Sequence, residues 1–292
     1  MIMHTIRIRL GLWAVLAIAI FSTACSQKNR KFESPAGYNL NEPKKIVMPP
    51  SLAEISGLAF YQGNPDTIYA EEDESGKFYF LKPGDKRSSF FKFGKHGDYE
   101  DVAICNNYVI MLRSNGTLFT FPFADIHQQE ETGNVLEWKD LLPKGEYEGM
   151  YADELNKLIY IICKECEDEK SSKMVKGYIL QLTNDGKINQ NGAFSVDVEH
   201  IESLTGDKKI KFRPSALAYN HRTNEWYIIS SINKLLVITD SNWKVTAAYK
   251  LNPAIYIQPE GMAFDKNGNL YISNEGGDLH SGNILKINWS GK

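Results

Sequence analysis

Three glutamates, Glu100, Glu148 and Glu260, are the residues of this chain whose type and spacing best suit chemistry. Each of them belongs to a short sequence phrase that recurs along the chain, and each occupies the same place in its copy of the phrase. Carboxylates gathered in a partly dehydrated site repel one another, and each tends to take up a proton unless a cation is bound. Oxygen ligands without His or Cys suit a hard ion, and Ca²⁺ accepts about 6 to 8 of them. We therefore predict a Ca²⁺ site formed by these glutamates, with Glu275 and Asn274 as further ligands.

The recurring phrase occurs five times and predicts the architecture that positions these glutamates. Its copies read Glu54-Ile-Ser-Gly-Leu-Ala-Phe60, Tyr99-Glu-Asp-Val-Ala-Ile104, Tyr147-Glu-Gly-Met-Tyr151, Arg213-Pro-Ser-Ala-Leu-Ala-Tyr219 and Gln258-Pro-Glu-Gly-Met-Ala-Phe264. Aligned at positions 57, 101, 149, 216 and 261, they are spaced by 44, 48, 67 and 45 residues. Repeats of roughly 40 to 50 residues made of short strands are typical of β-propeller blades. We predict an all-β fold for residues 43–292, a five-bladed β-propeller of four-stranded antiparallel blades.

Propeller geometry explains why the glutamates should meet. The innermost strand of a blade lines the central channel and the second strand returns, so the start of the first and the end of the second share one face. Glu100, Glu148 and Glu260 stand at the starts, and Asn274 and Glu275 stand at a return. The acidic run at residues 71–74 also follows a return, but we interpret it as a solvated loop.

The fifth repeat shows only three strand-like runs, whereas residues 44–48 form a strand-like run outside any repeat. An unpaired strand edge promotes aggregation, and closed propellers avoid such edges. We therefore predict that this N-terminal strand supplies the outer strand of the fifth blade and closes the ring.

The first residues have the pattern of a targeting segment. A basic start is followed by the apolar run Leu10 to Phe21, which is shorter than the roughly 20 residues that span a bilayer. Ser22-Thr-Ala-Cys25 resembles a bacterial lipobox, so we predict a signal peptide at 1–24, lipidation of Cys25 and a flexible tether over 25–42. The alternative is an ordinary cleavable signal with an incidental Cys. No acidic cluster follows Cys25, which favours a lipid-anchored protein of the bacterial cell envelope that faces the periplasm.

Composition restricts the partners. The chain has 33 Lys and Arg against 36 Asp and Glu, and no basic stripe. Nucleic acid is therefore not an expected partner.

The sequence contains no nucleophile elbow, phosphate-binding loop or dinucleotide fingerprint. Cys163 and Cys166 have a spacing that permits a local disulfide in an exported protein. We expect a monomer.

The wording of the repeats resembles that of the SdiA-regulated family of exported bacterial proteins, over about residues 45 to 290. The phrases that carry the resemblance are Glu-Ile-Ser-Gly-Leu-Ala, Tyr-Glu-Gly-Met, Gln-Pro-Glu-Gly-Met-Ala-Phe-Asp and Leu-Tyr-Ile-Ser-Asn-Glu. The resemblance implies a five-bladed propeller, distantly similar to NHL-repeat propellers, with a calcium site. It implies no reaction.

Two questions stay open at the level of sequence. Arg113, Lys164 and Arg213 are able to neutralise the channel carboxylates without any metal. The function is either that of a calcium-stabilised binding module for an unknown protein or glycan, or that of a metal-dependent hydrolase acting on a lactone or phosphate ester. The sequence shows no candidate acid/base His at a blade end and no phosphate-binding cluster, so we favour the binding module.

Overall fold

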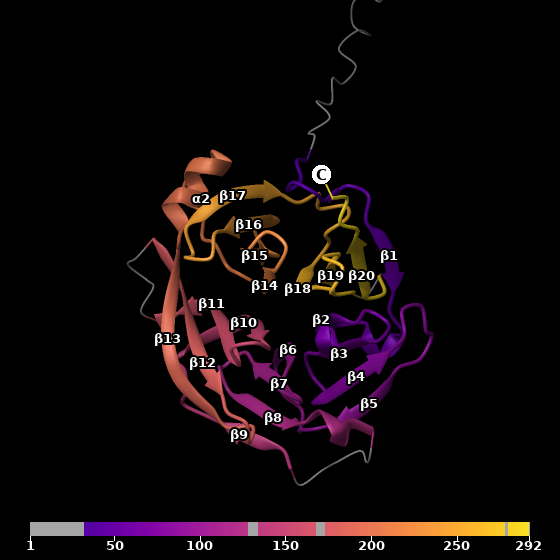
Figure 1. Ribbon diagram of the computed structural model, residues 1–292. Helices are drawn as coiled ribbons and strands as arrows, with labels where there is room; N and C mark the ends of the chain where they lie inside the picture. Colours follow the sequence, from indigo (N-terminus) through magenta and orange to yellow (C-terminus); the bar gives the residue numbers. More distant parts are fainter. Residues whose placement is uncertain (1–31, 128–133, 168–172, 278–279, 292) are drawn as a thin grey trace, which may run out of the picture. The chain divides into compact units, whose positions relative to one another are not determined.

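Five four-stranded antiparallel sheets stand as blades around one axis (Figure 1). The computed structural model describes residues 32–127, 134–167, 173–277 and 280–291. The predicted signal peptide and Cys25 lie outside the described residues. Within the part that is described, no helix has the length and apolarity needed to cross a bilayer.

Each blade contains strands that are consecutive in the chain, except the last. Blade 1 has β2 (Ile55–Ala59), β3 (Ile68–Glu72), β4 (Lys77–Leu81) and β5 (Ser89–Lys92); blade 2 has β6 (Tyr99–Cys105), β7 (Tyr108–Arg113), β8 (Leu118–Pro122) and β9 (Leu136–Trp138); blade 3 has β10 (Gly145–Asp153), β11 (Leu158–Cys166), β12 (Met174–Leu182) and β13 (Ile188–Asp197); blade 4 has β14 (Ala216–Asn220), β15 (Glu225–Ser230), β16 (Leu235–Thr239) and β17 (Val245–Lys250); blade 5 has β18 (Pro259–Phe264), β19 (Leu270–Asn274), β20 (Asn283–Ile287) and β1 (Lys44–Val47).

The prediction of ring closure is confirmed. Strand β1 pairs antiparallel with β20, with Lys45 opposite Leu285 and Ile46 opposite Ile284. Ile46 is buried, whereas its neighbour Val47 is 55% exposed, as expected for a strand with one face on the core. The N-terminal strand thus completes blade 5 and covers the edge that β20 would otherwise expose.

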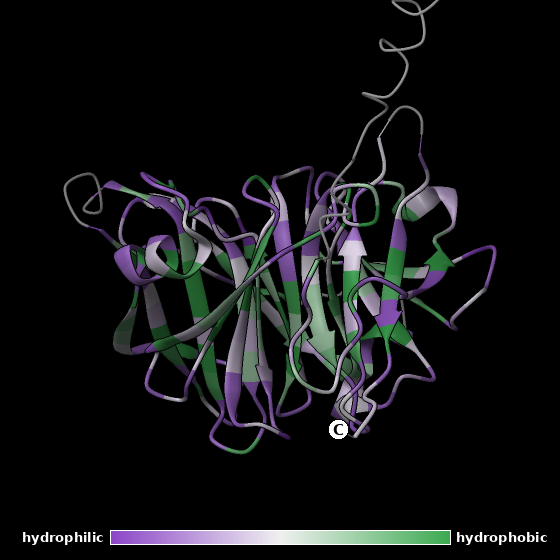
Figure 2. Ribbon diagram, turned by 90° about the horizontal axis from the view of Figure 1, so that it is seen from above, coloured by the Kyte–Doolittle hydropathy of each residue, from purple (hydrophilic) through white to green (hydrophobic). Residues whose placement is uncertain are grey.

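The apolar side chains gather between blades. Five hydrophobic clusters occur, and each joins residues of two neighbouring blades. Figure 2 shows hydrophobic residues concentrated along the strands and hydrophilic ones in many of the loops at both ends. Because every blade supplies both faces of its sheet to a junction, the strands are rich in β-branched and aromatic residues, as the sequence pattern indicated.

The ordered unit begins before the predicted boundary at residue 43. It extends from Phe32, and Tyr38 and Leu40 are buried in the cluster between blades 4 and 5. The Tyr38 hydroxyl donates to the Gly268 carbonyl at 2.8 Å, and the Tyr256 hydroxyl donates to the Leu40 carbonyl at 2.8 Å. The final part of the predicted tether is therefore packed structure, because its two apolar side chains complete a blade junction.

Short helical segments connect the strands. They are the 3₁₀ segments η1 (Pro50–Leu52), η2 (Tyr61–Gly63) and η3 (Phe123–His127), and the α-helix α2 (Val198–Thr205). Helix α2 accounts for the long interval between the third and fourth phrases. It begins at Asp197, whose side chain accepts hydrogen bonds from the backbone N–H groups of Glu199 and His200, and it ends at Gly206 in the left-handed conformation.

Candidate cation site at one end of the channel

Each phrase glutamate lies beside an irregularity in the pairing of its own inner strand. The pairing of β6 with β7 shifts register between Tyr99 and Asp101, and the pairing of β18 with β19 shifts between Pro259 and Gly261. The β10 strand shifts on both sides of Tyr147. A bulge leaves one residue outside the ladder and re-aims its side chain. Glu100, Glu148 and Glu260 are the residues next to these shifts, so the bulges turn their carboxyls toward the channel.

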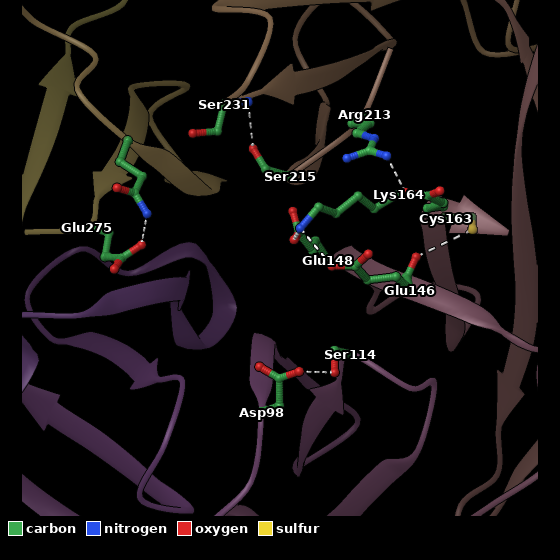
Figure 3. A network of polar contacts seen from close by, with 12 residues as sticks. Asp98, Ser114, Glu146, Glu148, Cys163, Lys164, Arg213, Ser215, Ser231 and Glu275 are labelled. Atoms are coloured by element: carbon green, nitrogen blue, oxygen red, sulfur yellow. Dashed lines mark hydrogen bonds and ion pairs between the residues drawn. The ribbon is translucent and has the colours of Figure 1, made fainter. Parts of the chain in front are cut away.

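The predicted glutamates line one cavity. It has a volume of about 170 Å³ and receives residues from all five blades. Six of the lining side chains are carboxyls and two are cations; they are Asp73, Asp98, Glu100, Glu148, Glu260 and Glu275, with Lys164 and Arg213. Figure 3 shows labelled members of this set extending from different blades around a common space. Four of the five predicted ligands, Glu100, Glu148, Glu260 and Glu275, are thus brought together.

Burial makes the charged state of these glutamates costly. Burial, followed by the charges of Glu148 and Asp98, raises the pKa of Glu100 to about 9. Burial and the charge of Glu148 raise the pKa of Glu260 to about 8. Burial raises the pKa of Glu148 to about 7, although its hydrogen bond with Lys164 acts in the opposite direction. Without a cation, raised pKa values keep these carboxyls partly protonated. A bound cation would lower the pKa values again and favour the charged carboxylates.

The two cations of the cavity are already paired. Lys164 lies 2.8 Å from Glu146 and also bonds to Glu148 (Figure 3). Burial lowers the pKa of Lys164, but the hydrogen bonds to these two glutamates raise it above its usual range overall. Arg213 pairs with Glu165. The neutralising network considered from the sequence therefore exists in part, yet the carboxyls still outnumber the cations by four.

A disulfide fixes the segment that carries Lys164. Cys163 and Cys166, at the end of β11, are bonded and both are buried. Lys164 and Glu165 lie between them, so the two residues that pair with Glu148 and Arg213 are anchored on each side. The sequence spacing left this pairing open, and the structure contains the bond. Cys105 is buried with a free thiol.

Asn274 does not belong to the cavity. It is fully buried, and its side-chain amide donates to the Ile255 carbonyl at 3.0 Å and to the Asn283 side chain at 3.3 Å. It is the last residue of β19, where side chains alternate between faces, so Glu275 faces the channel while Asn274 faces the blade. Asn274 is therefore not placed with the other four predicted ligands.

The sequence-based interpretation of residues 71–74 as a solvated loop is wrong for the first two. Glu71 and Glu72 belong to strand β3 and are buried. Glu72, Asp73 and Glu54 have carboxylate oxygens within 4.8 Å of one another, the one such set that we find among the described residues. Asp73 also lines the cavity, and its buried Oδ1 has no hydrogen-bond partner. Burial, then the charge of Glu54, raises the pKa of Asp73 to about 6.

The inner strands close in on one another at the level of the aligned phrase residue. A Cβ at Gly57 would lie 2.4 Å from Asp101 Oδ1, and one at Gly261 would lie 2.3 Å from the Ser56 carbonyl oxygen. Glycine recurs in the phrase because the inner strands approach closely there. In blade 2 this position is Asp101, whose side chain accepts hydrogen bonds from the Val102 N–H at 2.8 Å and from the Met150 N–H of blade 3 at 2.6 Å.

Glu71 lies beside this closure. Its Oε1 accepts a hydrogen bond from the Gly57 N–H at 2.7 Å, and its Oε2 has no partner among the described residues. Burial raises the pKa of Glu71 well above its usual range. Sequence reasoning missed the burial because four consecutive acidic residues are usually solvated, and strand β3, which is buried at all five residues, has no alternating pattern that would have revealed it.

Comparison with known proteins supports the fold. Residues 189–279 match the model of the family described as SdiA-regulated. No curated protein matches the chain. Among solved structures, a glutaminyl cyclase from Myxococcus xanthus is 15% identical, with a TM-score of 0.55 over 84% of this chain and 93% of that one. A regucalcin from Agrobacterium tumefaciens, described as a calcium-binding protein, is 14% identical, with a TM-score of 0.42 over 82% of this chain and 71% of that one.

At such identity the likeness to the glutaminyl cyclase shows a shared fold and nothing about activity. Together with the five-bladed propeller, the match over residues 189–279 confirms the resemblance of this chain to the SdiA-regulated family.

Proposed function

We propose that this protein is a lipid-anchored binding module of the bacterial cell envelope, and that its propeller holds Ca²⁺ in the acidic cavity. The observation that carries the proposal is the excess of carboxyls in a cavity of about 170 Å³, where both lining cations are already paired. The donors are all oxygens, which suits a hard cation. The unpartnered Oδ1 of Asp73 is a further acceptor at the wall of the same cavity.

Glu100, Glu148, Glu260 and Glu275 are the proposed protein ligands, and Asp73 joins them from blade 1. Their oxygens are not assembled within ligand distance of one another as the Glu54, Glu72 and Asp73 set is. The ion would therefore be held by a subset of these carboxylates, with water in its remaining positions, as Ca²⁺ commonly accepts. A bound ion would neutralise the channel end and fix the inner-strand starts of several blades.

A partner surface adjoins this cavity. Ile232, which lines it, is 62% exposed, and Ile257, next to the lining residue Gln258, is 41% exposed. Apolar side chains exposed beside a charged cavity are typical of surfaces that contact a partner. We propose that a protein or glycan binds at this face and that the Cys25 lipid keeps the module at the membrane, facing the periplasm.

The binding role is preferred over hydrolysis for a reason visible in the site. A metal-dependent hydrolase would use the proposed ion to polarise its substrate, but it would also need protein groups that are free to donate to the charge that develops. Lys164 and Arg213, the cations among the lining residues, are engaged by Glu148 and Glu165. The lining residues include no His to act as a base.

Calorimetric titration with Ca²⁺ tests the proposal. The chain from Ser26 onward, stripped with a chelator, is compared with a Glu148→Gln/Glu260→Gln double variant and with Asp66→Asn, an exposed acid outside the cavity. We expect saturable binding that is at least tenfold weaker in the double variant and unchanged in Asp66→Asn. An Asp73→Asn variant shows whether blade 1 shares the ion.

Absence of Ca²⁺ binding by the parent chain would overturn the metal site. Equal affinity in parent and double variant would place the ion elsewhere. The anchor is tested separately in the full chain, where Cys25→Ser should move the protein from the membrane fraction to the soluble fraction of the cell.

A further inference from the structure

We propose that the opposite end of the channel is a second binding site, for a small organic anion with a flat apolar body. This site is distinct from the acidic cavity in position, lining and charge. The inference goes beyond the proposed calcium-dependent role and does not depend on it.

The opposite cavity has the size of a ligand site. Its volume is about 680 Å³, and the later halves of all five inner strands and the turns that follow them line it. Sites for small molecules usually have volumes of about 300 to 1,000 Å³ and largely apolar walls with a few placed polar groups. The acidic cavity, at about 170 Å³, suits an ion with its water, whereas this one admits an aromatic molecule.

The cavity is open because one column of the repeated phrase is small. The residue two places after the aligned position is alanine in four blades, namely Ala59, Ala103, Ala218 and Ala263, and all four line the cavity. The same column is Tyr151 in blade 3. A strand interior usually favours β-branched or aromatic residues, so repeated alanine at one level leaves space around the axis.

The walls above this alanine level are apolar and aromatic. Phe60, Tyr219 and Phe264 come from the next position of the phrase and line the cavity. Tyr151 lies against Trp226, with ring centroids 5.3 Å apart. Aromatic walls of this kind favour a flat apolar ligand, because stacked and edge-to-face contacts add to the burial of apolar area.

The acids at the mouth of the cavity accept hydrogen bonds from groups of their own turns and of neighbouring turns. Asp265 accepts hydrogen bonds from Asn267, Asn269 and Tyr271. Asp153 accepts from the backbone N–H groups of Leu155 and Asn156 and from the Asn156 side chain. Glu154 accepts from the Asn106 N–H at 2.7 Å. These donors are neutral and leave the carboxylates charged, so an anion at this mouth must be held by the cations beside them.

The cations at the same mouth retain donors. Arg222 uses Nε to donate to the Asn267 carbonyl at 3.0 Å, which orients its guanidinium without engaging the terminal nitrogens in any described hydrogen bond. The Lys266 ammonium has no described partner, and its backbone is held by a 2.8 Å hydrogen bond to the Gly63 carbonyl. An anionic group at the mouth would meet these two side chains, and Arg222 has the fork geometry that suits a carboxylate or sulfonate.

A layer of close strand contacts lies between the two cavities. In this layer Gly57 of blade 1 lies against Asp101 of blade 2, and Gly261 of blade 5 lies against Ser56 of blade 1. The acidic cavity has six carboxyls against two cations, whereas the lining of the opposite cavity has three acids and two cations. An anion is therefore expected at the opposite cavity rather than at the acidic one.

The probe for the test is 8-anilinonaphthalene-1-sulfonate, a flat aromatic anion whose fluorescence rises in apolar surroundings. We expect saturable binding of one probe per chain from Ser26 onward, without any metal. Arg222→Gln/Lys266→Gln should weaken binding at least tenfold, because it removes both cations from an exposed mouth without changing the core. Ala263→Leu should weaken binding similarly, because it fills a partly exposed wall of the cavity.

Two controls separate this site from general surface binding. Glu148→Gln/Glu260→Gln, at the other end of the channel, should leave probe affinity unchanged. Excess neutral naphthalene-amine of the same ring size should compete poorly. Probe affinity that is unchanged in both the Arg222/Lys266 variant and Ala263→Leu, or the absence of saturable binding, would overturn the inference.

Discussion

At the scale of single residues, the centre of the propeller contains two buried carboxyl side chains with different hydrogen-bond demands. Asp101 uses both oxygens as acceptors for backbone N–H groups, whereas Glu71 uses only one. Burial raises the pKa of both groups well above the usual range. The same amide substitution should therefore cost little stability at Glu71 and more at Asp101.

Glu71→Gln should change the free energy of unfolding by less than about 1 kcal/mol at pH 7, because glutamine keeps the acceptor for Gly57 and carries no charge to desolvate. Asp101→Asn should cost about 1 to 3 kcal/mol, because either orientation of the amide places an NH₂ group against a backbone N–H. Urea denaturation of both variants checks this. Equal losses of stability would contradict the assigned hydrogen bonds.

At the scale of elements, strand β1 and the bulged inner strands determine what the fold can do. The register shifts of β6, β10 and β18 re-aim Glu100, Glu148 and Glu260, and they turn these strand residues into cavity residues. Strand β1 closes the ring, and Ile46 joins the cluster between blades 5 and 1. The contribution of Ile46 to the free energy of unfolding can be separated from that of its exposed neighbour Val47.

Ile46→Ala should lower the free energy of unfolding by about 2 to 4 kcal/mol, because it removes a buried side chain from the closing junction. Val47→Ala, on the exposed face of the same strand, should change it by less than about 0.5 kcal/mol. Denaturant titration of the two variants measures the difference. A larger loss for Val47→Ala than for Ile46→Ala would mean that the strand pairs in the other register.

At the scale of the whole molecule, stability, pH and cation binding are coupled through the acidic cavity. Burial raises the pKa of Glu148, Glu260 and Glu100 to about 7, 8 and 9 from an ordinary value of 4.5. The folded state therefore holds more protons than the unfolded chain above about pH 5, and stability falls as pH rises. A bound cation has the opposite effect on the pH dependence of stability, because it favours the ionised carboxylates of the folded state.

In chelator, the free energy of unfolding should thus be greatest near pH 5 and should fall steadily up to about pH 9. Saturating Ca²⁺ should flatten or reverse this slope, since the ion binds the ionised form. Chemical denaturation from pH 5 to 9 with and without Ca²⁺ measures both effects, and Glu148→Gln/Glu260→Gln should show a smaller slope in chelator. The same slope in the double variant and its parent would show that other groups control the pH dependence.

The sequence by itself determined the five blades, the closing strand and the level at which acidic side chains gather. These follow from local pattern: short β-rich runs, a phrase at blade spacing, and Gly where inner strands approach closely. The sequence also placed Glu100, Glu148, Glu260 and Glu275 at one face, because strand direction in a propeller follows from connectivity.

Only the tertiary structure decided which side chains share a cavity. The pleat turns Asn274 into its blade, and the burial of Glu71 and Glu72 depends on neighbouring blades that the local sequence does not describe. The packing of Tyr38 and Leu40 likewise depends on a junction more than 180 residues away along the chain. The opposite cavity is lined by alanines that give no signal individually in the sequence. They leave space only where five inner strands converge on one axis, because free volume is a property of the assembled ring.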